Sequence, residues 1–239
     1  MDIQLNGNES NKNNRKYFSK YFCREYIIKT IICIIGVFII GIGISVMRYV
    51  DLGLDPFMCL SNGIYLTVSK PLNISFGTSF LLFTFVLVIA VFIFDRAEIG
   101  LGTVIAMSLT GYISDFGFFL CNLILAEMAE YLIFRIFMMF FGVILISIGS
   151  GIYFNTHIGV SPYDATGLAI TAKVGNEKMY RFVRIGTDII CVIGGFLMGN
   201  IPGVGTVVMA FFTGPLFSFF RNTFFVWGKN LKIITWYNK

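Results

Sequence analysis

The sequence contains little charge: only 13% of its 239 residues are Asp, Glu, Lys or Arg, about half the share found in soluble domains. So few charges cannot cover the surface of a water-soluble globule, and they exclude a disordered chain and a nucleic-acid-binding module as well. Hydrophobic residues make up 56% of the chain. The composition therefore predicts a protein embedded in the lipid bilayer. The chain is long enough for about six spans of ~20 residues and leaves no room for a separate soluble domain.

Cysteine and histidine are also scarce. The five cysteines form no C-x-x-C pair, and the single histidine, His157, has no partner at metal-ligand spacing. We therefore predict buried thiols, no disulfide framework, no metal site and no cofactor. The motifs H-E-x-x-H and G-x-S-x-G are absent from the sequence, so no motif predicts an enzyme.

Long apolar runs predict an all-α polytopic membrane protein. Five runs are spanning helices by length, and a sixth, 182–198, is shorter and contains Arg184 and Asp188. Two amphipathic stretches, 57–69 and 163–173, have about half the length of a span, which predicts re-entrant half-helices. If both crossed instead, the chain would have eight spans, and the distribution of basic residues fits both topologies equally. The five clear runs are 27–47, 76–94, 100–121, 131–152 and 203–220.

The sequence contains an internal repeat. GLDPF at 53–57 recurs as GVSPY at 159–163, an offset of 106, and GLGT at 100–103 recurs as GVGT at 203–206, an offset of 103. A deletion of three residues reconciles the two offsets. Three spans per repeat is an odd number, which predicts that the second repeat is inverted relative to the first, as in many transporters. Four spans per repeat would give parallel repeats.

The repeat defines the domain organisation that we expect. We predict a disordered tail (1–25), a first membrane repeat (26–121), an extracytoplasmic linker (122–130), a second repeat (131–221) and a C-terminal tail (222–239). Basic residues flank the first and last apolar runs, so both tails are predicted to be cytoplasmic. Small residues at Gly41/Ser45 and at the equivalent Ser147/Gly151 predict close helix packing.

These motifs resemble those of the YczE/YyaS/YitT group of bacterial integral membrane proteins. The group's first-half motif G-x-D-P is present at residues 53–56, and its second-half form G-x-S-P-x-D includes Ser161, Pro162 and Asp164. The resemblance covers roughly residues 27–221. It implies a multi-spanning protein of the bacterial plasma membrane and implies no particular activity.

The two proline motifs have a structural and a functional interpretation. Asp55-Pro56 and Ser161-Pro162 are typical helix starts, in which the side chain accepts a backbone N–H and proline occupies the first helical position. If both half-helices begin near the membrane centre, their positive N-termini would also face each other and suit an anion or a polar permeant.

The remaining candidate residues are charged or titratable. Arg184 and Asp188 lie one turn apart on one helix face, where they are either a solute site or an interfacial pair. His157 precedes the second half-helix and is either solvated or part of a proton relay. Asp115 and Arg135 are predicted at the membrane interface, with the alternative that Asp115 joins a central polar cluster.

Three classes of function remain open from the sequence. The leading prediction is a transporter or channel-like protein for a small polar or anionic solute. The alternatives are an accessory or scaffold subunit without a permeant, and an intramembrane enzyme that would use Asp55 and Asp164. The expected partners are membrane lipid and that solute, with no nucleic acid, and a homo-oligomer is left open.

Overall fold

The computed structural model describes residues 24–94, 99–174 and 180–230, and every element in these ranges is helical. The all-α fold class is thereby confirmed. The elements are α2 (Arg24–Val50), α3 (Pro56–Ile64), the π-helical turn η1 (Tyr65–Ser69), the 3₁₀ turn η2 (Lys70–Leu72), α4 (Phe76–Phe94), α5 (Leu101–Leu125), the 3₁₀ turn η3 (Ala126–Glu130), α6 (Leu132–Phe154), α7 (Pro162–Val174), α8 (Tyr180–Leu197) and α9 (Val204–Asn230).

Five helices are long and apolar enough to cross a membrane, namely α2, α4, α5, α6 and α9, and they match the five clear runs of the sequence. Their outer faces carry large apolar side chains such as Ile133, which is 85% exposed. Such surfaces suit lipid and not water. α8, predicted as the sixth span, contains Arg184 and Asp188 and is not among the five. Neither are α3 and α7, which have 9 and 13 residues.

Three helices extend beyond their predicted ends. α2 begins at Arg24, α5 continues to Leu125 inside the predicted linker, and α9 continues to Asn230 inside the predicted C-terminal tail. The polarity of the sequence changes where a helix leaves the membrane, but a helix does not have to end there, so composition predicts these helices too short. Residues 1–23 and 231–239 of the predicted tails lie outside the described residues.

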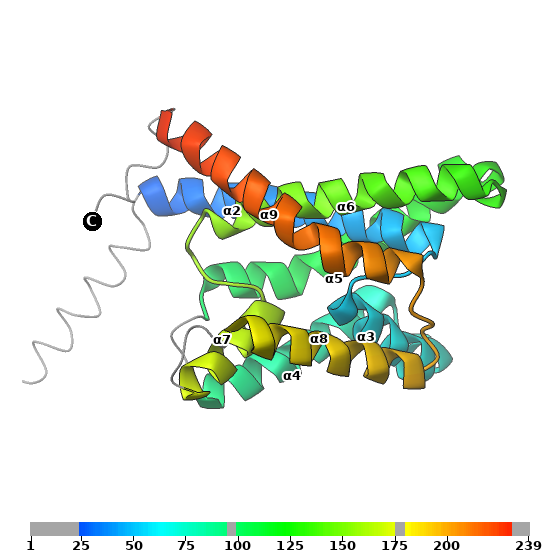
Figure 1. Cartoon of the computed structure of the whole chain (residues 1–239), viewed down its shortest axis with the longest axis horizontal. Coiled ribbons are helices and arrows are strands. Elements are labelled where there is room, and N and C mark those ends of the chain that lie inside the picture. The colour runs from blue at the N-terminus through cyan, green and yellow to red at the C-terminus, as the bar shows by residue number, and fades with distance from the viewer. Residues whose placement is uncertain (1–23, 95–98, 175–179, 231–239) are drawn as a thin grey trace, which may run out of the picture.

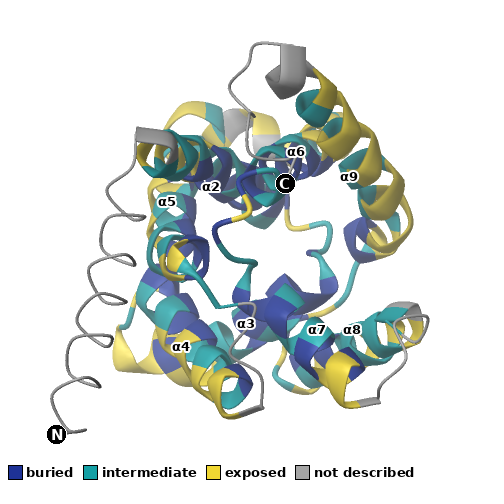
Figure 2. Ribbon diagram, turned by 90° about the vertical axis from the view of Figure 1, so that its left-hand side faces the viewer, coloured by how far each residue is buried: buried dark blue, intermediate teal, exposed yellow. Residues whose placement is uncertain are grey.

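The helices form two groups (Figure 1). The long-helix group consists of α2, α5, α6 and α9, with α2 against α5 and α6 and with α9 against α6. The short-helix group consists of α3, α4, α7 and α8, in which α3 packs against α8 and α4 packs against α7. Viewed along the helices, α5 and α4 lie on one side of the molecule and α9 and α8 on the opposite side (Figure 2).

Glycines allow α2 and α6 to pack closely and antiparallel. A Cβ atom at Gly36 would lie 2.9 Å from the carbonyl oxygen of Gly149, and a Cβ at Gly142 would lie 3.3 Å from that of Gly43. Residue numbers rise along one helix as they fall along the other, so the two chains run in opposite directions. The predicted small residues also pack closely, but against other helices: a Cβ at Gly41 would lie 2.6 Å from Ile113 of α5, and a Cβ at Gly151 would lie 3.2 Å from the backbone of Phe220 in α9.

Each half-helix follows a connection with left-handed backbone, and the two connections have matching contacts. The φ angle is 115° at Gly53 and 131° at Gly159, a region that favours glycine. The N–H of Gly205, at the start of α9, donates to Leu52 O at 2.7 Å. At the other end of the bundle, the N–H of Gly102 in α5 donates to Ile158 O at 2.9 Å.

One hydroxyl differs between the two connections. Thr103 donates to Val160 O at 2.6 Å and accepts the N–H of Gly100 at 3.2 Å, whereas the buried hydroxyl of the equivalent Thr206 has no partner within the described part of the chain. We expect Thr103→Val to lower the free energy of unfolding by ~1–3 kcal/mol, because it leaves two backbone groups unpaired. Thr206→Val serves as the matched control and should change the free energy of unfolding little. Thermal unfolding of both variants in detergent measures the difference, and equal shifts would contradict it.

Candidate functional site

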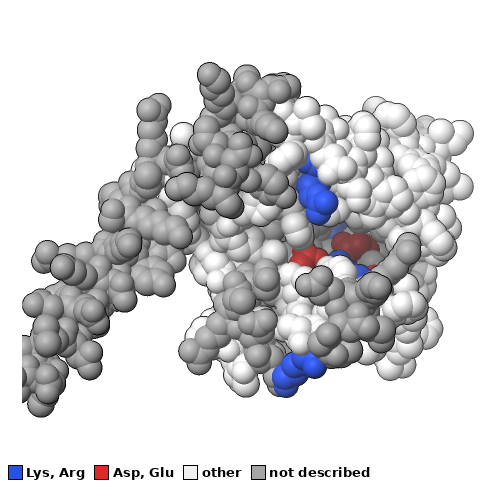
Figure 3. Space-filling model, turned by 60° about the vertical axis from the view of Figure 1, so that its left-hand side comes forward, with Lys and Arg blue, Asp and Glu red and all other residues white. Residues whose placement is uncertain are grey.

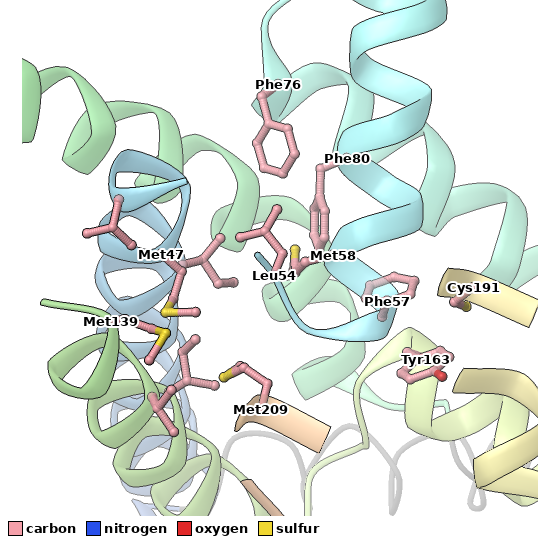
Figure 4. Close-up of a cluster of buried hydrophobic side chains, with 14 residues drawn as sticks. Met47, Leu54, Phe57, Met58, Phe76, Phe80, Met139, Tyr163, Cys191 and Met209 are labelled. Carbon is pink, nitrogen blue, oxygen red and sulfur yellow. The ribbon is translucent and has the colours of Figure 1, made fainter. Parts of the chain in front are cut away.

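The N-termini of the two half-helices meet through stacked aromatic rings. Phe57 in the first turn of α3 and Tyr163 in the first turn of α7 have ring centroids 4.6 Å apart and planes inclined by 14°. Figure 4 shows these two side chains facing each other where α3 and α7 begin. Phe57 and Tyr163 occupy the same position of the recurring sequence motif, so the stack joins equivalent positions of the two motifs.

Both half-helices begin as the sequence predicts. The Asp55 carboxylate accepts the backbone N–H groups of Phe57 and Met58 at 3.1 and 3.2 Å, and Pro56 is the first residue of α3. In α7, which begins at Pro162, the Ser161 hydroxyl accepts the N–H of Asp164 at 3.2 Å and donates to the Asp164 carboxylate at 2.7 Å. A carboxylate therefore lies at each positive helix end, where it is stabilised by the helix dipole.

Arg184 on α8 connects the two acidic residues of the second repeat. Its guanidinium forms an ion pair with Asp164 at 2.5 Å and lies 3.7 Å from the Asp188 carboxylate. It also covers the ring of Tyr163, whose hydroxyl donates to Asp188. The predicted pair of Arg184 and Asp188 is thus present, but the shorter ion pair is with Asp164. These residues, together with Asp55 at the start of α3, form what we call the central cluster: Asp55, Tyr163, Asp164, Arg184 and Asp188.

The charged side chains of the central cluster are only partly buried. Side-chain exposure is 17% for Asp164 and 32% for both Arg184 and Asp188. Figure 3 shows the side of the molecule on which α2 begins, where acidic and basic side chains are visible inside a hollow in an almost uncharged surface. Desolvating ionic groups within a membrane is costly, so their partial contact with solvent favours a site that water can reach.

A second charged pair lies on α2 and α5. Arg48, whose side chain is 8% exposed, forms an ion pair with Asp115 at 3.0 Å. The guanidinium lies 3.7 Å from the ring centroid of Phe76, and the other oxygen of Asp115 accepts the N–H of Gly77 at 2.7 Å. The sequence suggested an interfacial Asp115 or membership of a central cluster, and the structure instead gives it its own buried partner.

Two other predicted residues lie away from the central cluster. Arg135 donates to the backbone oxygens of Val50 and Asp51 and so satisfies the end of α2. His157 is exposed in the connection before α7 and has a φ angle of 52°. Partial desolvation and the charges of Lys29 and Arg221 lower the pKa of His157, which favours a neutral ring at pH 7. A relay role for His157 remains a prediction.

No group of three or more histidine, cysteine or acidic residues in the described ranges is placed to hold a metal ion.

Phe57 and Tyr163 were not among the residues predicted for the site, although both directly follow the proline of a repeated motif. Because the two residues occupy the same position of the motif, the sequence could have predicted that their rings are in contact.

Comparison with known proteins supports the resemblance to YczE-like membrane proteins. Residues 27–222 match the model of a family of unknown function, DUF6198. The chain belongs to this family. It is 24% identical to the uncharacterized membrane protein YczE of Bacillus subtilis over 82% of the chain and 86% of that protein. It is 28% identical to an uncharacterized protein of Haemophilus influenzae over 81% of the chain and 84% of that protein. No solved structure matches the chain.

Proposed function

We propose that this DUF6198 member is a transporter built from two inverted repeats that moves a small polar solute past the central cluster. The antiparallel packing of α2 against its equivalent α6 supports the inversion. So does the exchange of contacts, because α3 packs against α8 as α7 packs against α4. Proteins with inverted repeats commonly bind their solutes where the repeats meet, at the ends of broken helices.

The observation that carries the proposal is the composition of the central cluster. Charged groups inside a membrane protein are costly and usually mark a route for ions or solutes. Here Arg184, Asp164 and Asp188 lie at the start of a half-helix and remain partly exposed. The equivalents of Arg184 and Asp188 in the first repeat are Leu81 and Phe85, so symmetry of the fold does not require these charges.

The charge of the cluster favours a neutral or cationic solute, or a cationic co-ion, over an anion. Asp55, Asp164 and Asp188 are three carboxylates beside the single guanidinium of Arg184. Two helix N-termini contribute only about half a positive charge each, so the cluster has no net positive charge that would attract an anion. An anion would also have to displace a carboxylate from Arg184.

We expect Asp188→Asn to abolish transport while the protein remains in the membrane. The substitution removes the charge that Arg184 and Tyr163 contact and retains the shape of the side chain. Purified protein in liposomes would be assayed for uptake of labelled amino acids, monoamines, diamines and inorganic phosphate. Uptake of any solute that the wild-type protein carries should fall at least tenfold, as a loss of ~1.4 kcal/mol or more of binding or barrier free energy implies.

The matched control is Asp51→Asn. Asp51 is exposed and has a φ angle of 48°, which asparagine adopts readily, so this variant undergoes the same chemical change outside the central cluster and should transport normally. Uptake by Asp188→Asn equal to that of Asp51→Asn would refute the proposed site. Wild-type liposomes that take up none of the probes, together with function in cells that survives Asp188→Asn, would favour the accessory-subunit alternative.

A further inference from the structure

The equivalent helix pairs of the two repeats differ in how they pack. In the first repeat α4 packs along α5. In the second repeat the equivalent helices, α8 and α9, have no extensive contact with each other within the described chain. A Cβ at Gly111 of α5 would lie 2.8 Å from the Cα of Gly77 in α4. A Cβ at Gly214, the equivalent of Gly111 in α9, would have nothing within 4 Å.

Polar contacts hold the first of these two junctions closed. Asp115 of α5 accepts both the N–H of Gly77 at the start of α4 and the guanidinium of Arg48. Beside them the hydroxyl oxygens of Thr78 and Tyr112 are 3.4 Å apart. The equivalent of Asp115 in α9 is Ser218, which is exposed. We call the α4–α5 contacts the closed junction, and the surfaces of α8 and α9 around Tyr180 and Gly214 the open junction.

The two junctions lie at opposite ends of the bundle. The closed junction is near the end of α2, and the open junction is near the beginning of α2 (Figures 1 and 2). The hollow in which the acidic and basic side chains are visible is seen from the open end (Figure 3). The open junction and this hollow therefore lie on the same side of the molecule, the side on which α2 begins.

We infer that the two repeats exchange these conformations, so that the short-helix group rocks against the long-helix group and opens one junction as it closes the other. The inference rests on the proposed transport function, because the exchange of the junctions would expose the central cluster to each side of the membrane in turn. The near-equivalence of the repeats makes a second state of similar packing available. In that state α8 lies against α9 at Gly214, the hydrogen bond from Gly77 to Asp115 is broken, and Thr206 bonds to Leu54 O as Thr103 now bonds to Val160 O.

Two cysteine pairs test this exchange in a background whose native cysteines are replaced by alanine. Thr78→Cys with Tyr112→Cys reports the closed junction, and Tyr180→Cys with Gly214→Cys reports the open one. In membranes each pair should form a disulfide under mild oxidation when present alone, because each junction closes in one of the two states. When all four cysteines are present, one molecule should contain one of the two disulfides and never both.

Asp115→Asn supplies the energetic test. It weakens the hydrogen bond from the Gly77 N–H to a charged acceptor, which exists only while the closed junction is intact and is worth ~1.5–3 kcal/mol. The ratio of 180–214 to 78–112 crosslinking should therefore rise about tenfold. Ser218→Ala, at the equivalent position of α9, should leave this ratio unchanged.

Hydrogen exchange provides a second readout in the chain with its native cysteines. In Asp115→Asn the amides of residues 76–80 should exchange faster and those of 180–184 more slowly. The inference is overturned if the 180–214 disulfide never forms, if both disulfides form in one molecule, or if Asp115→Asn behaves as Ser218→Ala in both assays. If the junctions exchange but no uptake depends on Asp188, the inference stands and the transport proposal is refuted.

Discussion

Replacing Gly203 by alanine should prevent the protein from folding. A Cβ at this position would lie 2.1 Å from the carbonyl oxygen and 2.6 Å from the carbonyl carbon of Leu52. Both are backbone atoms, and the same stretch is fixed by the bond from Gly205 N–H to Leu52 O. The connection that leads into α3 would have to move, at a cost of at least the ~1–3 kcal/mol typical of overpacking. The yield of monodisperse protein after extraction from membranes measures the effect.

Gly186→Ala is the control for this substitution. Gly186 lies within α8, and a Cβ there would have nothing within 4 Å, so alanine should be neutral or stabilise the helix by ~0.5–1 kcal/mol. The repeat adds an internal replicate, because a Cβ at Gly100 would likewise lie 2.1 Å from Ile158 O. Normal yield and thermal stability of Gly203→Ala would show that the connection does not pack as described.

Local features of the chain could be predicted from the sequence. The five clear runs became membrane-length helices because a helix that satisfies its own backbone needs only apolar side chains to cross lipid. Asp55-Pro56 and Ser161-Pro162 begin helices as predicted because capping depends on neighbours within three residues. The similar backbone conformation of the connections at Gly53 and Gly159 also follows from the repeated motif.

Partners in space could not be predicted in the same way. Arg184 was paired with Asp188 because residues four apart on a helix are neighbours, yet its shorter ion pair is with Asp164, and only the fold sets that distance. Arg48 and Asp115 are 67 residues apart and have no charged equivalents in the second repeat, so neither periodicity nor the repeat could pair them. Gly41 and Gly151 pack closely as predicted, but only the fold sets α5 and α9 as their partners.

Arg184→Gln should destabilise the protein because it breaks a partly buried ion pair. It leaves Asp164 and Asp188 close together without the guanidinium that lies between them and over the Tyr163 ring. Breaking a fully buried pair costs ~3–5 kcal/mol. Because the Arg184 side chain is 32% exposed, we expect about half of that, roughly 2 kcal/mol, in unfolding measured by SDS titration in mixed micelles.

The double variant Arg184→Gln/Asp164→Asn decides whether the loss comes from the pair. Removing the Asp164 charge as well relieves the uncompensated carboxylate, so the double variant should be more stable than Arg184→Gln alone, with a coupling free energy of about 1 kcal/mol. Lys70→Gln, which removes an exposed positive charge, should stay within ~0.5 kcal/mol of the wild-type protein. Strictly additive effects of the Arg184 and Asp164 substitutions would show that the ion pair contributes nothing. The proposed preference for a neutral or cationic solute would then be weakened, since an anion would not have to displace a carboxylate from Arg184.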